Sequence, residues 1–140
     1  MSHNKADDQF LSQVNHIATM LVVSNIDSSI EFYKNIFGFE VKRYEKNLIA
    51  LLKFQNTQLY FITYSPSTPD KPDVELKTLD TKGKTPVSVV FNVKDCDKTY
   101  QMLLKRGLKF LTPPQSPPWG GKRCFALDPD GYLLEIEEGT

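Results

Sequence analysis

Hydrophobic and polar positions repeat the same order of patterns in the two halves of the chain. In the first half, the aliphatic and β-branched run over residues 17–24 predicts a largely buried strand. An apolar stripe at helical spacing follows, formed by Ile26, Ile30, Tyr33 and Phe37. Three short strand patterns come next, over residues 39–45, 48–54 and 57–64, separated by turn-like polar pairs. The first half therefore predicts the element order βαβββ.

Local signals mark the two ends of the helix in this first half. Ser28 and Glu31 have the spacing of a capping box, which predicts the helix start near them. Gly38 stands where a residue of left-handed backbone conformation commonly ends a helix.

The second half predicts the same order of elements. Residues 87–94 form a strand pattern, and Asp95 is a candidate N-cap for the helix that follows. The helix carries an apolar stripe of Cys96, Tyr100, Leu103 and Leu104 and is predicted to end at Gly107. Three more strands are predicted over residues 108–112, 122–128 and 132–138, with a hairpin turn over residues 128–131.

This repetition predicts one domain over residues 1–140. Its parts are a polar leader (1–15), a first half (16–64), a proline-rich linker (65–86) and a second half (87–138). Each half-sheet is too small to bury its own face alone. We therefore expect an α+β fold in which two βαβββ repeats form a curled mixed sheet around a cleft.

Aligning the two halves selects four positions around the expected cleft. The first strands align with Ala18 on Ser88, and the last strands align with Phe61 on Glu135. Glu135 is the one carboxylate of this set, so it is the candidate group for metal binding or proton transfer. Burial beside Phe61 would disfavour the charged carboxylate and so favour a role in proton abstraction.

Composition narrows the range of partners. The chain has 140 residues with 17 basic and 17 acidic side chains, a balance that argues against a nucleic-acid partner. No apolar run is long enough to span a bilayer, and the polar start lacks the pattern of a signal peptide. We expect a cytoplasmic protein whose two cysteines remain thiols and whose His3 belongs to the polar leader.

Two segments of the chain carry a family resemblance. TMLVVSNIDSSIEFYKNIFGFEV in the first half and RCFALDPDGYLLEIEE at the end resemble the vicinal oxygen chelate superfamily. That superfamily includes glyoxalase I, extradiol dioxygenases, methylmalonyl-CoA epimerase, fosfomycin-resistance enzymes and bleomycin-resistance proteins. The resemblance covers residues 16–138 and implies the glyoxalase/bleomycin-resistance fold. It says less about chemistry, because one scaffold can host unrelated activities.

The resemblance also implies where a metal would bind. In the metal enzymes of this superfamily, His and Glu ligands come from the first and last strands of each half. Here those positions hold Ala18, Phe61, Ser88 and Glu135, and only Glu135 could act as such a ligand. His16 lies two residues before Ala18 and is a further candidate, although a strand-end histidine without a metal is the preferred interpretation. We therefore predict no metal ligands and no cofactor.

Similarity to the fosfomycin-resistance enzymes implies that Arg123 and Phe125 point into the cleft and that Trp119 lies at its mouth. The predicted ligand-binding residues are Phe61, Ser88, Trp119, Arg123, Phe125 and Glu135. Structural interpretations remain open for several of them. Phe61 and Phe125 could be core residues, Trp119 could cover an edge of the core, and Arg123 could simply pair with Glu135.

Three functions fit this pattern. The first is metal-independent binding of a small, partly aromatic organic molecule, similar to sequestration by bleomycin-resistance proteins, which by analogy implies a homodimer. The second is a glyoxalase-like lyase or isomerase in which Glu135 is catalytic and a divalent metal binds at an unidentified site. The third is a protein that uses the cleft as a ligand sensor, or that docks to another chain through a contact surface on the 65–86 linker. No membrane or nucleic-acid partner is expected.

Overall fold

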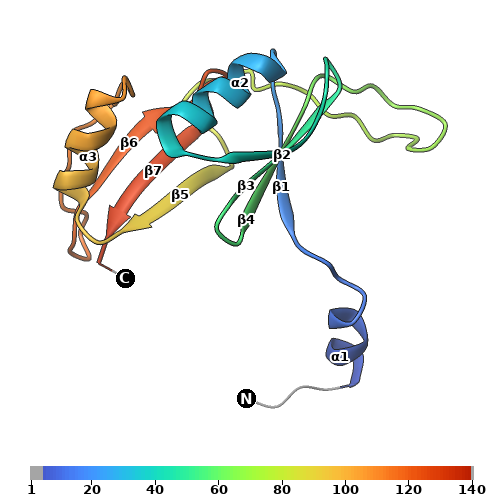
Figure 1. Ribbon diagram of the computed structural model, residues 1–140, viewed down its shortest axis with the longest axis horizontal. Helices are drawn as coiled ribbons and strands as arrows, with labels where there is room; N and C mark the ends of the chain where they lie inside the picture. The colour runs from blue at the N-terminus through green and yellow to red at the C-terminus, as the bar shows by residue number, and fades with distance from the viewer. Residues whose placement is uncertain (1–4, 140) are drawn as a thin grey trace.

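The structure is a computed structural model that describes residues 5–139 (Figure 1). Its helices are α1 (Lys5–Leu11), α2 (Ile26–Phe32), the π-helical turn η1 (Tyr33–Phe37) and α3 (Cys96–Lys105). Its strands are β1 (Ala18–Val22), β2 (Glu40–Glu45), β3 (Ile49–Phe54), β4 (Thr57–Ile62), β5 (Ser88–Val93), β6 (Arg123–Leu127) and β7 (Leu133–Glu138). The predicted fold class is confirmed.

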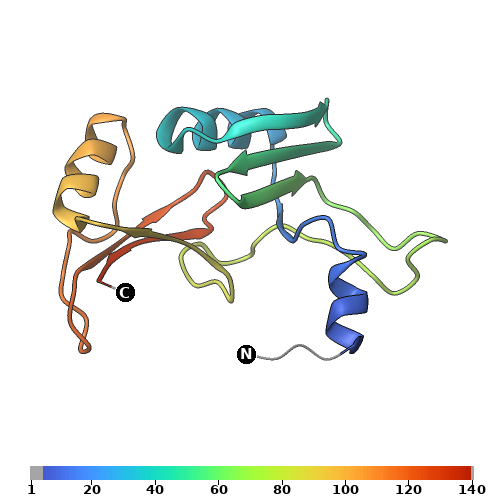
Figure 2. The ribbon, with the colours of Figure 1, turned by 60° about the horizontal axis from the view of Figure 1, so that its bottom comes forward.

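The strands form two open mixed sheets. The first sheet has the order β1-β4-β3-β2 and the second has the order β5-β7-β6. In each sheet the first strand of its half runs parallel to the last strand, while the other neighbours are antiparallel. Figures 1 and 2 show the sheets at an angle to each other, with α2 above the place where they meet.

The predicted strand over residues 108–112 is wrong. The segment makes a single bridge, between Phe110 and Ala126, and the Leu111 N–H donates to the carbonyl of Phe125 at 2.8 Å. Pro113 and Pro114 follow directly, and proline has no N–H to extend a ladder. Residues 108–112 therefore form no continuous ladder with β6, and the next bridge to β6 is an isolated one between Gln115 and Arg123.

Helix α2 begins earlier than the capping-box spacing predicted. Asn25 has an extended backbone, and its side chain accepts a hydrogen bond from the Ser28 N–H at 2.9 Å, so Asn25 is the N-cap. The predicted end at Gly38 is confirmed, because this residue has a φ of 84° and caps η1.

Helix α3 begins and ends as predicted. The Asp95 side chain accepts from the Lys98 N–H at 3.0 Å, which makes Asp95 the N-cap and the counterpart of Asn25 in the first half. Gly107 follows the helix with a φ of 97°. The local capping signals of the two halves thus correspond.

The hydrophobic core lies between the helices and one face of each sheet. Alternate strand residues face it, including Leu59 and Phe61 in β4 and Leu134 and Ile136 in β7. Phe37 of η1 stacks on Phe91 of β5, with ring centroids 4.4 Å apart. The helical segment of the first half therefore packs directly against the second sheet.

A buried polar cluster, here called the Asp128 latch, also joins the halves. The Asp128 carboxylate accepts from the Tyr33 hydroxyl and from the N–H groups of Asp130 and Tyr132, each at 2.9 Å. The Tyr132 hydroxyl donates to the Val22 carbonyl at 2.9 Å and accepts from the Val22 N–H at 3.1 Å. The predicted hairpin turn at residues 128–131 is present, and it fastens the last hairpin to β1 and η1 of the first half.

The leader and the linker both contain local structure. Helix α1 was not predicted; it stands clear of both sheets in Figures 1 and 2, and the Phe10 side chain is 70% exposed. The linker forms an arm that folds back on itself through a bridge between Ser65 and Leu76. His3 lies outside the described residues, and within residues 5–139 no helix is long and apolar enough to cross a membrane.

Cys96 and Cys124 are buried free thiols whose sulfur atoms lie 3.8 Å apart. Burial raises the pKa of both thiols, that of Cys124 to about 12. Because the thiolate is the reactive form, we expect the native protein at pH 8 to react with the thiol reagent DTNB on the order of a hundredfold more slowly than the protein in guanidinium chloride. Fast labelling of both thiols in the native protein would contradict this burial.

Candidate ligand-binding site

Each sheet has a second face, here called its outer face, that points away from the helices and the core. In the first sheet Met20 pairs with Tyr60, and in the second sheet Val90 pairs with Glu135. Aligning β1 with β5 as predicted places Met20 on Val90, so the register makes Tyr60 the counterpart of Glu135. The alignment of the last strands from sequence was therefore shifted by one residue.

Phe61 consequently lies on the wrong face to bind a ligand beside Glu135. Its side chain is 0% exposed and packs in the core, with its ring centroid 5.2 Å from that of Tyr33. Since neighbouring strand residues point to opposite faces, Tyr60 and not Phe61 reaches the outer face. The predicted burial of Glu135 beside Phe61 is wrong for the same reason, and Glu135 is only half-buried.

The other predicted ligand-binding residues lie on or beside the outer face of the second sheet. They are Ser88 on β5, Arg123 and Phe125 on β6, Glu135 on β7, and Trp119 on the loop that leads into β6. Phe125 and Glu135 are direct cross-strand partners. Side chains from three strands and one loop therefore gather on a single sheet face.

Trp119, Arg123 and Phe125 form a stack, here called the aromatic shelf. The central carbon of the Arg123 guanidinium lies 4.8 Å from the centroid of the Trp119 ring and 5.3 Å from that of Phe125. Both contacts are within cation–π range. Trp119 is 72% exposed, so most of its indole surface is free to contact another molecule.

The loop that carries Trp119 is fixed at its base. The backbones of Gln115 and Arg123 exchange two hydrogen bonds, each 2.9 Å long, which close the loop. Gly121 has a φ of 71°, and a Cβ atom there would lie 2.6 Å from the Glu138 carbonyl oxygen. A glycine is required at this point, where the loop passes against the end of β7.

Glu135 lies near the centre of the outer face of the second sheet. It lies in the middle strand of the second sheet, between Val90 on one side and Phe125 on the other. The alternative in which Arg123 merely pairs with Glu135 is wrong, since no ion pair within residues 5–139 involves Arg123. The outer face therefore offers a carboxylate and a guanidinium as separate groups.

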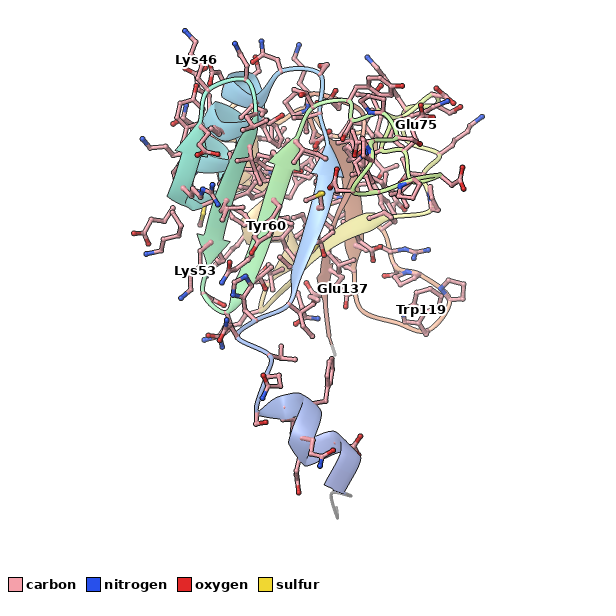
Figure 3. The ribbon with its side chains drawn as sticks, turned by 90° about the vertical axis from the view of Figure 1, so that its right-hand side faces the viewer. Lys46, Lys53, Tyr60, Glu75, Trp119 and Glu137 are labelled. Carbon is pink, nitrogen blue, oxygen red and sulfur yellow. The ribbon has the colours of Figure 1, made fainter. Side chains whose placement is uncertain are left out.

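The outer face of the first sheet carries a polar pair that the sequence did not predict. A ring nitrogen of His16 hydrogen-bonds the Tyr60 hydroxyl, and the two rings meet edge to face with centroids 6.0 Å apart. Figure 3 shows Tyr60 over the first sheet and Trp119 on the loop well away from it. Leu59 and Leu134 are the equivalent buried residues of the two last strands. Aligning them places Tyr60 on Glu135, so this alignment would have identified Tyr60 from the sequence.

The candidate metal-ligand positions do not form a divalent metal site within one chain. His16 is bound to Tyr60 on the first sheet, whereas Glu135 lies on the second. Ala18 and Ser88 occupy the two first-strand positions, and neither is an imidazole or a carboxylate. Across residues 5–139 no three or more His, Cys, Asp or Glu side chains converge in a way that could hold a metal ion.

Residues 13–136 match the family model of the Glyoxalase/Bleomycin resistance protein/Dioxygenase superfamily. The chain belongs to this superfamily. The vicinal oxygen chelate relationship expected from the two sequence segments is thereby confirmed.

The similar proteins do not share one named activity. Protein YraH of Bacillus subtilis is 30% identical over 118 residues, covering 83% of this chain and 91% of YraH. The metallothiol transferase FosB of Shouchella clausii is 27% identical over 130 residues, covering 91% of this chain and 80% of FosB. Lactoylglutathione lyase of Agrobacterium tumefaciens matches in structure with a TM-score of 0.71 and 18% identity, covering 91% of this chain and 96% of the lyase. Superfamily membership therefore fixes the fold but no single activity.

Proposed function

We propose that this protein binds a small, partly aromatic organic molecule on the outer face of its second sheet, without a bound metal, and sequesters it unchanged. The observation that carries the proposal is the aromatic shelf, an exposed indole stacked on a guanidinium that is itself stacked on a phenyl ring. Aromatic side chains supply large contact areas with little conformational freedom to lose. Glu135 and Ser88 add polar groups that can orient the ligand.

A thermal-shift screen of chelator-treated protein tests this proposal. We expect some aromatic antibiotics to raise the melting temperature in a concentration-dependent way, because a ligand that binds only the folded state stabilises it. The shift should be the same with and without added divalent metal. If no aromatic compound in a broad panel stabilises the metal-free protein, the proposal fails.

The alternative is a glyoxalase-like lyase or isomerase in which Glu135 transfers a proton. Its support is the half-buried position of Glu135 on the same face, together with the names of the two relatives that are a transferase and a lyase. Metal analysis of untagged protein and an assay with hemithioacetals distinguish the two functions. Stoichiometric metal with turnover that Glu135→Gln abolishes would favour the enzyme over the binding protein.

We also propose that the protein is a homodimer in which a second copy contacts the outer faces around Met20 and Val90 and leaves the aromatic shelf open to the ligand. Apolar side chains remain uncovered there, with Met20 41% and Val90 49% exposed. Exposed apolar side chains on a sheet face commonly mark a contact surface. A cytoplasmic location also remains a proposal, supported by the two free thiols.

Light scattering after size exclusion tests the dimer. We expect twice the monomer mass for the wild type and a shift toward monomer for Val90→Lys, because a charge would have to be buried in the contact. Met102→Lys is the matched control, since Met102 is 50% exposed but lies on α3. A monomeric wild type, or equal effects of both substitutions, would contradict the proposed contact.

A further inference from the structure

We propose that the ligand is an aromatic carboxylate, with its ring on the aromatic shelf, its carboxylate on Arg123 and a hydrogen-bond donor at its other end facing Glu135. This inference rests on the proposed function and adds the chemical class of the ligand. It starts from the Arg123 guanidinium, which contacts two rings and, within residues 5–139, takes part in no ion pair.

The stack restrains Arg123 without using its hydrogen-bonding groups. The Trp119 and Phe125 rings contact the guanidinium at 4.8 Å and 5.3 Å, and such contacts leave the N–H groups at the edge of the guanidinium plane available. Within residues 5–139 the Arg123 side chain takes part in no ion pair. The planar guanidinium can therefore donate two parallel N–H hydrogen bonds to the two oxygens of a carboxylate.

The neighbouring charged residues have other partners. Glu137 is the cross-strand partner of Arg123, yet its carboxylate accepts a hydrogen bond from the Asn92 amide on β5 at 3.0 Å. Lys122 precedes Arg123, and its ammonium group forms an ion pair with Asp97 of α3 at 2.5 Å. An incoming carboxylate therefore meets Arg123 as the cation at the shelf, while Glu137 is hydrogen-bonded to Asn92 and Lys122 is paired with Asp97.

Restraint by the rings also lowers the cost of binding. A free arginine side chain loses rotamer freedom when it binds an anion, but a stacked one has already lost much of it. The exposed face of Trp119 can meanwhile carry the ligand ring, because stacked and edge-to-face ring contacts are favourable beyond the area that they bury. The carboxylate and the ring are thus recognised by adjoining parts of one shelf.

The spacing of the polar groups sets the size of the ligand. Arg123 lies two residues along β6 from Phe125, and Phe125 faces Glu135 across the strands. Strand geometry places the Cα atoms of Arg123 and Glu135, which are diagonal neighbours, roughly 7–8 Å apart. A fused two-ring acid with a hydroxyl group at the far end spans such a distance, with the hydroxyl donating to the Glu135 carboxylate.

Nuclear magnetic resonance of the tryptophan side chain tests this inference. The chain contains one tryptophan, so its single indole N–H signal reports on the shelf alone. The probes are 6-hydroxy-2-naphthoate, 2-naphthoate and 2-naphthamide, which share one ring system and differ in charge and in the donor. We expect both acids to bind the wild type at least about tenfold more tightly than the amide.

Two substitutions isolate the roles of the charged groups. Arg123→Gln should abolish the preference for acid over amide, whereas Lys122→Gln, the matched control that removes a neighbouring cation, should keep it. Glu135→Gln should reduce the preference for the hydroxy acid over the plain acid. Retention of both preferences in the Arg123 and Glu135 variants would overturn the assigned contacts.

The same titration separates this inference from the proposed function. If all three probes shift the indole signal with equal affinity, the carboxylate assignment is wrong but aromatic binding at the shelf stands. If none of them shifts the signal, the proposed function fails as well, because the shelf then does not bind flat rings.

Discussion

Replacing Asp128 with alanine should lower the free energy of unfolding by about 3 kcal/mol or more. Asp128 is only 5% exposed and accepts hydrogen bonds from the Tyr33 hydroxyl and from two backbone N–H groups. Alanine leaves all three donors without their acceptor in or near the core, and burial raises the pKa of Tyr33, which remains a neutral donor. Urea denaturation monitored by circular dichroism measures the change.

Asp80→Ala is the matched control, since Asp80 is exposed in the linker arm. That variant should stay within about 0.5 kcal/mol of the wild type. Equal stabilities of the two variants would mean that the Asp128 latch does not hold the halves together.

The pH dependence of the free energy of unfolding is a second test of the Asp128 latch. Burial raises the pKa of the Asp128 carboxyl above its ordinary value of 3.8, although hydrogen bonds from Tyr132, Tyr33 and Asp130 act in the opposite direction. The folded carboxyl then holds its proton more tightly than the unfolded one. Its contribution is complete below the unfolded pKa and is lost as the pH rises through the folded pKa. The stability of the wild type relative to Asp128→Asn should therefore fall from acidic toward neutral pH, and a rise would contradict the direction of the shift.

Replacing Trp119 with alanine should have the largest effect on ligand binding. We expect the free energy of binding to weaken by about 1–3 kcal/mol, or roughly 5- to 150-fold in the dissociation constant. The substitution removes the exposed ring of the shelf and frees the Arg123 guanidinium, which the indole restrains at 4.8 Å. Calorimetry with the tightest compound from the screen measures the change.

Tyr44→Ala controls for the loss of an exposed aromatic ring elsewhere. Tyr44 is 43% exposed on β2 of the first sheet, where its hydroxyl donates to Asp27. That variant should bind as the wild type does. Unchanged affinity in Trp119→Ala would remove Trp119 from the site.

Much of the fold could be predicted because its signals are local. Asp95, Gly38 and Gly107 act through their own backbone neighbours, and the apolar stripes need only helical periodicity. The prediction of a strand over residues 108–112 was wrong because a strand also needs a partner strand. The two prolines that follow this segment have no N–H to continue the pairing. The Asp128 latch could not be predicted, since Tyr33 lies 95 residues from Asp128 along the chain.

The sequence also predicted part of the candidate site. Trp119, Arg123 and Phe125 came from the resemblance and do meet in one stack. Phe61 was misplaced because the side-chain period of a strand is two, so an alignment error of one residue reverses the face. Tyr60 and Phe61 are both aromatic, and nothing in either residue alone reveals which one faces outward.

Tryptophan fluorescence during a titration of metal-free protein tests the central claim most directly. Trp119 is the only tryptophan in the sequence, so a change in emission reports on the shelf. With a compound from the thermal-shift screen, the account predicts saturable quenching with the same dissociation constant before and after a divalent metal is added. Quenching that occurs only once the metal is restored would contradict it.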